Sequence, residues 1–382
     1  MARYKLGEIC EIVSGSTPKT DVAEYWDGTE KWITPAELND ESYIIYDSVR
    51  KLTELGMKKT GLTPFPEGTV ILSSRAPIGK VAIAGCEMCC NQGFKNLVCS
   101  DIINNHYLYW FLKGNTAYLN SLGRGATFKE ISKQIVASIE INVPSQAEQL
   151  AAVEQLEKVT DIIRLRRAHL QKLDDLVKAR FVEMFGDPMT DVFKWSASTI
   201  GEQFNVASGG TPATGEKAYW ENGTIPWIGS NMCQDTMLSE NDGKFITEEG
   251  YAHSSTKWFH KGTVLVALVG ATIGKTALLR FDTTTNQNIA AIDVTPNAAF
   301  SSEFVFYHMQ MLYSKFMEIG SGKFKMANQG FIRQLPLICP PMELQEQFAA
   351  FVEQTDKSKV AVQKALDEAQ LLFDSLMQKY FG

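Results

Sequence analysis

A seven-residue repeat of apolar positions marks the middle of the chain. Between residues 147 and 185 the repeating positions are Leu156, Ile163, Leu170, Val177 and Met184, and Ile162 and Leu176 widen the same stripe. Neither Gly nor Pro interrupts this segment, which consists mainly of good helix formers, so we expect one helix about 55–60 Å long. Gly186 then supplies a C-terminal cap, and Pro188 prevents the helix from continuing.

A second long helix is expected at the end of the chain. Its apolar stripe is Val352, Leu366, Phe373 and Tyr380, at positions that match Leu156, Leu170, Val177 and Met184. Each helix has one stripe that must be buried, and the other helix is the simplest partner. We therefore predict an antiparallel coiled coil, in which Lys359 replaces Ile163 as a polar residue that sets the register.

The segments that precede the two helices repeat one another. Leu6-Gly7-Glu8 opens the first copy, and Ile200-Gly201-Glu202 opens the second, 194 residues later. Further matches are Ser14-Gly15-Ser16-Thr17-Pro18 with Ser208-Gly209-Gly210-Thr211-Pro212, Tyr25-Trp26 with Tyr219-Trp220, Ile78-Gly79-Lys80 with Ile273-Gly274-Lys275, and Asn91-Gln92 with Asn286-Gln287. Because order and spacing are kept, the pattern indicates a tandem duplication, with a period too long for a solenoid.

Each copy combines short apolar runs, broken by Gly, Pro and Thr, with shorter helical pieces at 105–113 and 302–316. The sequence thus predicts an α+β protein: two similar mixed α/β domains separated by two long helices, with pseudo-twofold symmetry. The expected boundaries are 1–143 for the first domain, 144–186 for the central helix, 187–341 for the second domain and 342–382 for the last helix.

Composition narrows the function classes. The net charge of −7, with no strongly basic region, argues against a self-sufficient basic DNA-binding domain, so any DNA contact must come from local clusters or a partner's charge. Seven scattered cysteines suit a reducing cytoplasm. No apolar run of eighteen residues and no leader-like N-terminus is present, so we expect a cytoplasmic protein without a membrane span.

No motif predicts a catalytic or metal centre. Gly270-Ala271-Thr272-Ile273-Gly274-Lys275-Thr276 is one residue short of a phosphate-binding loop, so a tight turn with an outward lysine is the favoured interpretation. Cys86 and Cys89 have loosely zinc-like spacing, but the second copy has no Cys or His there, which favours buried thiols. We predict no catalytic residue, no metal ligand and no cofactor in this chain.

Polar loops and turns are the candidate binding features. Loops 123–129 and 320–329 combine glycine with hydrogen-bond donors that can approach phosphates and base edges, although a merely solvated loop is the alternative interpretation. The candidate DNA-binding residues are Ser74, Arg75, Lys80, Arg124, Thr127, Lys129, Lys275, Ser321, Lys323, Lys325, Asn328 and Gln329. On the long helices, the candidate partner-docking residues are Gln149, Arg164, Arg167 and Gln347.

The duplicated pattern closely resembles the specificity subunit of type I restriction–modification systems. The resemblance rests on the ordered Leu/Ile-Gly-Glu, Ser-Gly-(Ser/Gly)-Thr-Pro, Tyr-Trp, Ile-Gly-Lys and Asn-Gln motifs, followed by a proline, a long helix and Phe185-Gly186-Asp187-Pro188. It covers essentially the whole chain, and the order of the motifs is more specific than any one of them.

The resemblance implies a non-catalytic recognition subunit with two target recognition domains, each reading half of a bipartite, asymmetric site on double-stranded DNA. It also implies that the long helices act as a spacer and dock two methyltransferase subunits, which carry S-adenosylmethionine. Where the complex also cleaves DNA, the resemblance implies two motor–nuclease subunits that use ATP and Mg. Two alternatives stay open: a recognition subunit of another methylation-based phage-defence complex, and a protein-interaction scaffold that reads no DNA.

Overall fold

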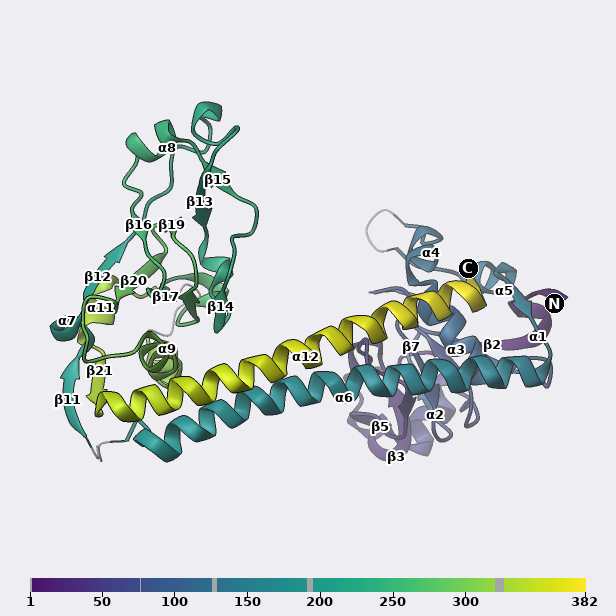
Figure 1. Cartoon of the computed structure of the whole chain (residues 1–382). Coiled ribbons are helices and arrows are strands. Elements are labelled where there is room, and N and C mark those ends of the chain that lie inside the picture. Colours follow the sequence, from purple (N-terminus) through teal and green to yellow (C-terminus); the bar gives the residue numbers. More distant parts are fainter. Residues whose placement is uncertain (1, 76, 126–128, 191–194, 320–325) are drawn as a thin grey trace. The chain divides into compact units, whose positions relative to one another are not determined.

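Two forty-residue helices run through the molecule, α6 (Gln146–Phe185) and α12 (Met342–Phe381) (Figure 1). The computed structural model describes residues 2–75, 77–125, 129–190, 195–319 and 326–382. Its internal contacts define unit 1, Met1–Arg166 with Ala365–Gly382, and unit 2, Arg167–Lys364. Both long helices predicted from the apolar repeat are confirmed, and each is divided between the two units. The four-part division of the sequence into domains and helices therefore stays a prediction.

In unit 1, the first half of α6 packs against the end of α12. Val159 and Ile163 are buried against Ala369, with Leu366, Phe373 and Leu376 beside them. Leu156, one turn earlier, is fully buried in the core of the unit. A fully buried aliphatic side chain contributes about 1.5–3 kcal/mol, so the stripe stabilises the helix pair and the domain core together.

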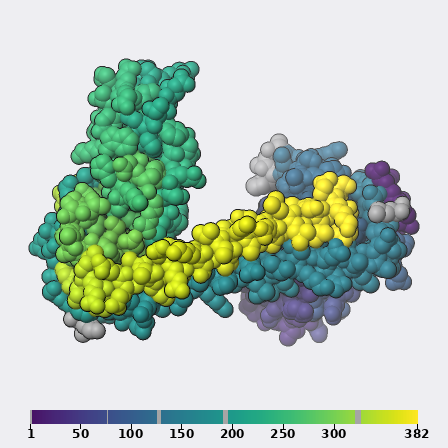
Figure 2. Space-filling view, in the orientation of Figure 1, coloured from purple at the N-terminus to yellow at the C-terminus, as the bar shows by residue number. Residues whose placement is uncertain are grey.

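In unit 2, the second half of α6 packs against the start of α12, as antiparallel pairing requires (Figure 2). Phe181 meets Phe348 edge to face, with ring centroids 5.5 Å apart. Lys359, the polar residue in the stripe, binds Asp174 on the facing helix at 2.7 Å. Its side chain is only 22 % exposed, so this pair compensates a largely desolvated charge. The predicted stripe was too wide, because Ile162 and Leu176 are 44 % and 48 % exposed.

The described residues of unit 1 form three sheets. A two-stranded sheet pairs β1 (Ala2–Lys5) with β10 (Glu140–Val143). The five-stranded sheet has the order β2 (Cys10–Ser14), β9 (Lys95–Cys99), β6 (Val70–Leu72), β7 (Val81–Ala84) and β4 (Ile44–Ile45). A smaller sheet has the order β5 (Arg50–Leu52), β3 (Trp26–Ile33) and β8 (Cys89–Cys90).

Unit 2 repeats this topology, as the duplicated sequence predicts. Its two-stranded sheet pairs β11 (Ser196–Thr199) with β21 (Pro336–Cys339). The five-stranded order is β12 (Asn205–Ser208), β20 (Ile289–Asp293), β17 (Val264–Ala267), β18 (Thr276–Leu279) and β14 (Thr236–Leu238). The smaller sheet gains a strand: β15 (Phe245–Ile246), β13 (Ile225–Ile228), β19 (Thr283–Thr285) and β16 (Trp258–Phe259).

Short helices cover and connect these sheets. In unit 1 they are α1 (Leu6–Ile9), α2 (Glu54–Thr60), α3 (Asn105–Gly114), α4 (Thr116–Ser121) and α5 (Lys133–Ser138), with 3₁₀ turns η1 (Ala23–Tyr25) and η2 (Pro35–Glu37). In unit 2 they are α7 (Ile200–Gln203), α8 (Glu248–Ala252), α9 (Ser302–Met311), α10 (Tyr313–Met317) and α11 (Gln329–Gln334), with η3 (Lys217–Tyr219), η4 (Ser230–Met232) and η5 (Gly270–Thr272). The helix expected at 302–316 is thus two helices, α9 and α10.

A buried glutamine fixes the start of each long helix. The Gln149 side chain accepts from the Asn104 amide at 2.8 Å and donates to the Ile102 and Pro144 carbonyls at 3.1 and 3.0 Å. The same three bonds recur in unit 2, where Gln345 accepts from the Ser301 amide and donates to the carbonyls of Ala299 and Pro340, each at 2.9 Å. Both glutamines are fully buried. One buried side-chain amide therefore pairs with a backbone donor and two backbone acceptors beside the start of the helix.

Replacing either glutamine should destabilise the unit that contains it. We expect Gln149→Ala to cost about 2–4 kcal/mol, because it leaves a buried amide and two carbonyls unpaired, and Gln345→Ala to cost as much in unit 2. Gln347→Ala, at an exposed position on α12, should change stability by less than about 0.5 kcal/mol. Scanning calorimetry measures the unfolding of the three variants. Equal stability of Gln149→Ala and Gln347→Ala would contradict the proposed stabilising role of the buried glutamine.

Candidate nucleic-acid interface

The repeated sequence motifs hold the start of each domain onto its sheets. In unit 1 the Trp32 indole donates to the Ser16 carbonyl at 3.0 Å, and in unit 2 the Trp227 indole donates to the Gly210 carbonyl at 3.0 Å. Thr211 donates to Gln287 at 2.5 Å, and Thr17 contacts Gln92 in the same way. The Ser-Gly-x-Thr-Pro and Asn-Gln motifs therefore bind to each other within each unit.

The Ile-Gly-Lys motif forms a tight turn that only glycine fits. Gly79 and Gly274 have φ values of +95° and +77°. A Cβ atom at Gly79 would lie 2.8 Å from Thr116 Cγ2, and one at Gly274 would lie 2.7 Å from Phe316 Cγ. In unit 2 the turn contains η5 and leads into a strand, not into the long helix that a phosphate-binding loop needs. The favoured interpretation, a turn between strands, is confirmed.

The lysines of this turn point inward, contrary to the sequence-based expectation. Lys80 Nζ donates to the Pro35 carbonyl at 3.1 Å and also contacts the Leu38 carbonyl. Lys275 Nζ binds the Asp235 carboxylate at 2.5 Å. Both amines are half-buried and already have partners within their unit. The predicted DNA contacts of Lys80 and Lys275 are therefore not supported.

In unit 1, a polar loop is fastened to the end of strand β6. The backbones of Arg75 and Arg124 each pair with Glu130, and the Arg124 amide donates to the Glu130 carbonyl at 3.0 Å. Arg124 and Lys129 are exposed and Arg75 is half-buried. Within the described residues, none of these three side chains forms an ion pair. These three cations can therefore meet an anionic ligand without first breaking an ion pair.

A buried lysine lies beneath this loop. Lys95 is 7 % exposed, and its amine contacts Glu130 Oε1 at 3.2 Å and Ser74 Oγ at 3.3 Å. Ser74 itself is fully buried, which contradicts the DNA contact predicted for it. Lys95 and Ser74 instead hold Glu130, the residue whose backbone closes the loop. Thr127 lies outside the described residues.

In unit 2 the corresponding loop is closed by apolar residues. Val269 pairs with Met326, and the Ala327 amide donates to the Leu268 carbonyl at 2.8 Å, as the Ile131 amide does to the Ser74 carbonyl in unit 1. Leu268 and Ala290 stand where unit 1 has Ser74 and Lys95. Asn328 is exposed, and its side chain caps α11 by accepting from the Phe331 amide at 2.9 Å. Gln329 is half-buried and accepts from Arg333 at 3.2 Å. Ser321, Lys323 and Lys325 lie outside the described residues.

The long helices expose more apolar surface than the sequence analysis predicted. Full burial contradicts the docking role predicted for Gln149, whereas Arg164, Arg167 and Gln347 are exposed. The sequence analysis did not predict exposed apolar residues on these helices. It named only Ile162 and Leu176 of this set, and assigned both to the buried stripe. On α6 and α12 they are Leu150, Ile162, Leu165, Leu176, Val182, Val360, Leu371 and Leu372, 38–70 % exposed.

The cysteines and histidines form no recognisable catalytic or metal centre. Cys89 and Cys90 are buried, and burial raises the pKa of each thiol to about 12. Burial lowers the pKa of His308 to about 4, so its ring is neutral at neutral pH, and its Nε2–H donates to the Pro336 carbonyl, 2.8 Å away. Among the described residues, no three His, Cys, Asp or Glu side chains are grouped to hold a metal ion, and no helix is long and apolar enough to cross a membrane.

A family model described as the type I restriction modification DNA specificity domain matches residues 1–175 and 193–369. The chain belongs to this family. It is 27 % identical to the type I restriction enzyme MjaIX specificity subunit of Methanocaldococcus jannaschii, over 98 % of this chain and 91 % of that one. The EcoR124I/EcoR124II specificity subunit of Escherichia coli is 32 % identical, over 29 % of this chain and 27 % of that one.

Two solved structures share the fold over the whole chain. The S subunit of a type I restriction–modification system from M. genitalium gives a TM-score of 0.58 at 16 % identity, covering 100 % of this chain and 96 % of that one. A chain from a structural study of complex assembly in the type I system gives 0.62 at 18 % identity, covering 100 % and 97 %. The resemblance drawn from the repeated motifs is confirmed: the chain is a specificity subunit, a recognition subunit that acts on DNA in assembly with other subunits.

Proposed function

We propose that the two units read the two halves of a bipartite, asymmetric site on double-stranded DNA. One observation carries this proposal: in both units the same scaffold closes a loop at the end of the central strand of the five-stranded sheet, but with different side chains. Unit 1 places Lys95, Ser74 and Glu130 where unit 2 places Ala290, Leu268 and Met326. Two domains with the same scaffold but different side chains in this loop would contact different bases, as the two halves of an asymmetric site require. Of the predicted contacts, Arg75, Arg124, Thr127, Lys129, Ser321, Lys323, Lys325, Asn328 and Gln329 belong to this proposal.

The partners in this proposal are two methyltransferase subunits, which bind S-adenosylmethionine and methylate adenine in the cytoplasm. Two motor–nuclease subunits, using ATP and Mg, complete a restriction enzyme.

Single-molecule methylome sequencing of a host that expresses this chain with its methyltransferase tests the proposal. A split, asymmetric methylated motif is expected. Unsplit methylation would contradict the two-reader arrangement, and no methylation despite a stable complex would favour a scaffold that reads no DNA.

Arg124 and Lys129 should bind DNA phosphates, because both are exposed and have no ion pair among the described residues. Arg124→Ala or Lys129→Ala should weaken DNA binding by the assembled complex. Each should also reduce the slope of log K against log salt by about 0.9 for every phosphate that the variant no longer neutralises. Lys59→Ala removes an exposed charge from α2 and should leave the slope unchanged. Fluorescence anisotropy at several salt concentrations measures the slopes, and a wild-type slope in both loop variants would remove this loop from the interface.

The exposed apolar residues of α6 and α12 are the proposed docking surface for the methyltransferase subunits. Exposed Leu and Val on a helix are typical of an interface, since a subunit that docks there removes them from water. Leu371→Glu should weaken binding of the methyltransferase subunit by at least about 30-fold, since it buries a carboxylate in an apolar contact. Leu55→Glu, at a residue of α2 that is 41 % exposed, is the matched control. Isothermal titration calorimetry measures the affinity of the methyltransferase subunit for both variants. Equal affinities for Leu371→Glu and Leu55→Glu would contradict a docking surface at Leu371.

We also propose that the paired helices set the number of unread base pairs between the half-sites. Inserting seven residues into both α6 and α12 keeps the apolar stripes in register and lengthens each helix by about 10 Å, or roughly three base pairs. The methylated motif should keep both half-sites and gain about three unread bases. An insertion into α6 alone breaks the pairing and serves as the control. Changed bases within a half-site would contradict the spacer role.

A further inference from the structure

Two free cysteines face each other across the five-stranded sheet of unit 1. Cys10 begins β2, Cys99 ends β9, and the strand register places them directly opposite one another. The Ser100 amide donates to the Ile9 carbonyl at 3.0 Å, whereas the Cys10 amide turns away from β9 and donates to the Leu6 carbonyl. Cys10 and Cys99 therefore form a non-hydrogen-bonded pair, because such pairs alternate with hydrogen-bonded ones along antiparallel strands.

This kind of pair brings two side chains close enough to form a disulfide. Its Cα atoms are about 4.5 Å apart, which lies within the roughly 4.4–6.8 Å that disulfides span. Both thiols lie on the core face of the sheet, where Cys99 packs against the cluster that contains Cys10. A hydrogen bond to Cys99, together with burial, raises the pKa of the Cys10 thiol. The two strands thus need no change of register to join the two sulfurs.

The repeat shows that the fold does not require cysteine at these two positions. By the spacing of the repeated motifs, Cys10 corresponds to Phe204 and Cys99 to Val294, which flank the Asn205–Asp293 pair of β12 and β20. Both side chains are buried in the core of unit 2. Unit 1 therefore has two facing thiols where the same fold packs two ordinary apolar side chains.

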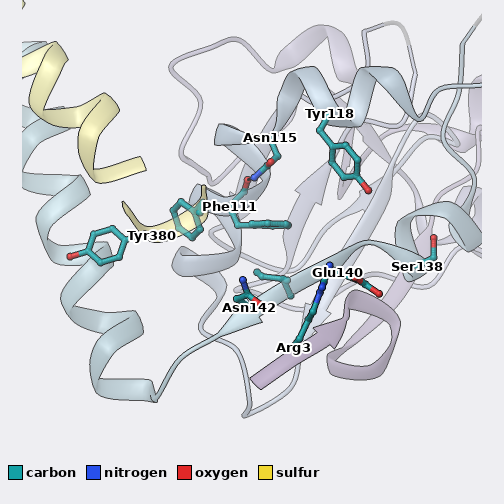
Figure 3. Close-up of a pocket in the computed structure, with 10 residues that line it drawn as sticks. Arg3, Phe111, Asn115, Tyr118, Ser138, Glu140, Asn142 and Tyr380 are labelled. Carbon is teal, nitrogen blue, oxygen red and sulfur yellow. Dashed lines mark hydrogen bonds and ion pairs between the residues drawn. The ribbon is translucent and has the colours of Figure 1, made fainter. Parts of the chain in front are cut away.

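A surface groove of about 410 Å³ gives small molecules access to one of the two thiols. It is lined by Cys99 and by Gln146, the first residue of α6. Cys99 is half-buried, whereas Cys10 is only 7 % exposed. A different pocket of unit 1, of about 370 Å³ beside Tyr118 and Tyr380, has no cysteine among its described lining residues (Figure 3). A small disulfide that enters the groove would thus meet Cys99 first.

We propose that Cys10 and Cys99 form a thiol–disulfide exchange site for low-molecular-weight disulfides, whose product is a cross-strand disulfide within unit 1. In the first step the ionised sulfur of Cys99 attacks the small disulfide, forms a mixed disulfide and expels one thiolate. The Cys10 thiol then loses its proton to water, and its sulfur attacks that of Cys99. This step forms the Cys10–Cys99 bond and expels the second thiolate. Two protein thiols are oxidised, and one small disulfide is reduced to two thiols.

The product would fasten β2 to β9 and close most of the first domain into one loop. Because a cross-link across a long loop restricts the unfolded chain, the oxidised form should melt at least about 5 °C above the reduced form. A reducing cytoplasm keeps the two thiols free. The cross-link therefore forms when small disulfides accumulate, and it stabilises unit 1 under those conditions.

Peptide mapping of the full chain after incubation with glutathione disulfide tests the exchange site. Once the remaining thiols are alkylated, trypsin releases residues 6–19 and 96–113, which contain Cys10 and Cys99 as their only cysteines. Mass spectrometry should find these two peptides joined, with the loss of two hydrogens. Cys99→Val should abolish the link, and Cys10→Val should leave glutathione on Cys99. Cys86→Val, at a half-buried cysteine outside the pair, is the matched control and should retain the link.

Wild-type peptides that stay separate after oxidation, or a Cys99 that joins a second chain instead of Cys10, would overturn the proposal. Circular dichroism checks that the valine variants fold, as the valine at position 294 of unit 2 leads us to expect. Scanning calorimetry then compares oxidised and reduced wild type, and equal melting temperatures would contradict the stabilising effect of the cross-link. Neither experiment contains DNA or methyltransferase, so their failure leaves the proposed function untouched.

Discussion

Burial of the apolar stripes on α6 and α12 is the interaction on which the rest of the structure depends. The stripe of α6 begins in the core of unit 1 at Leu156 and ends in the core of unit 2 at Phe181. Between them Val159 and Ile163 face α12. Because each half of the helix pair shares buried side chains with the core of its own unit, neither helix is an independent linker. Disrupting the pairing would expose part of each core.

The way in which each domain is joined to its helix follows from the same constraint. A helix that enters a core must begin without leaving buried polar groups unpaired, and a single glutamine at matching positions achieves this in both units. The tryptophan contacts to the Ser-Gly-x-Thr-Pro segments are repeated with matching partners, and the glycine of each Ile-Gly-Lys turn has a positive φ. The motif residues that the copies share therefore build the scaffold, whereas the residues that close the polar loop differ between the copies.

The loop of unit 1 shows how a scaffold with little positive charge can still favour an anionic ligand. Lys95 is buried and neutralised by Glu130, so its charge holds the loop in place. Arg124 and Lys129 stay exposed above it. Since the chain as a whole carries a net charge of −7, we propose that partner subunits supply a large share of the affinity for DNA.

The spacing of apolar residues and the internal repeat of the sequence were enough to predict the long helices and the duplicated domains. The seven-residue repeat predicted both long helices, and the order of short motifs predicted two similar domains and the family. The burial of Ser74 and Gln149 and the internal partners of Lys80 and Lys275 were not predicted, because a polar side chain gives no sign of its burial until distant residues surround it. Lys275 finds its counterion in Asp235, forty residues away, and Gln149 finds its partners on the loops that precede α3 and α6. Folding alone determines which polar residues become scaffold, which apolar ones stay exposed and where a pocket remains open, because each of these depends on contacts between segments far apart in the chain.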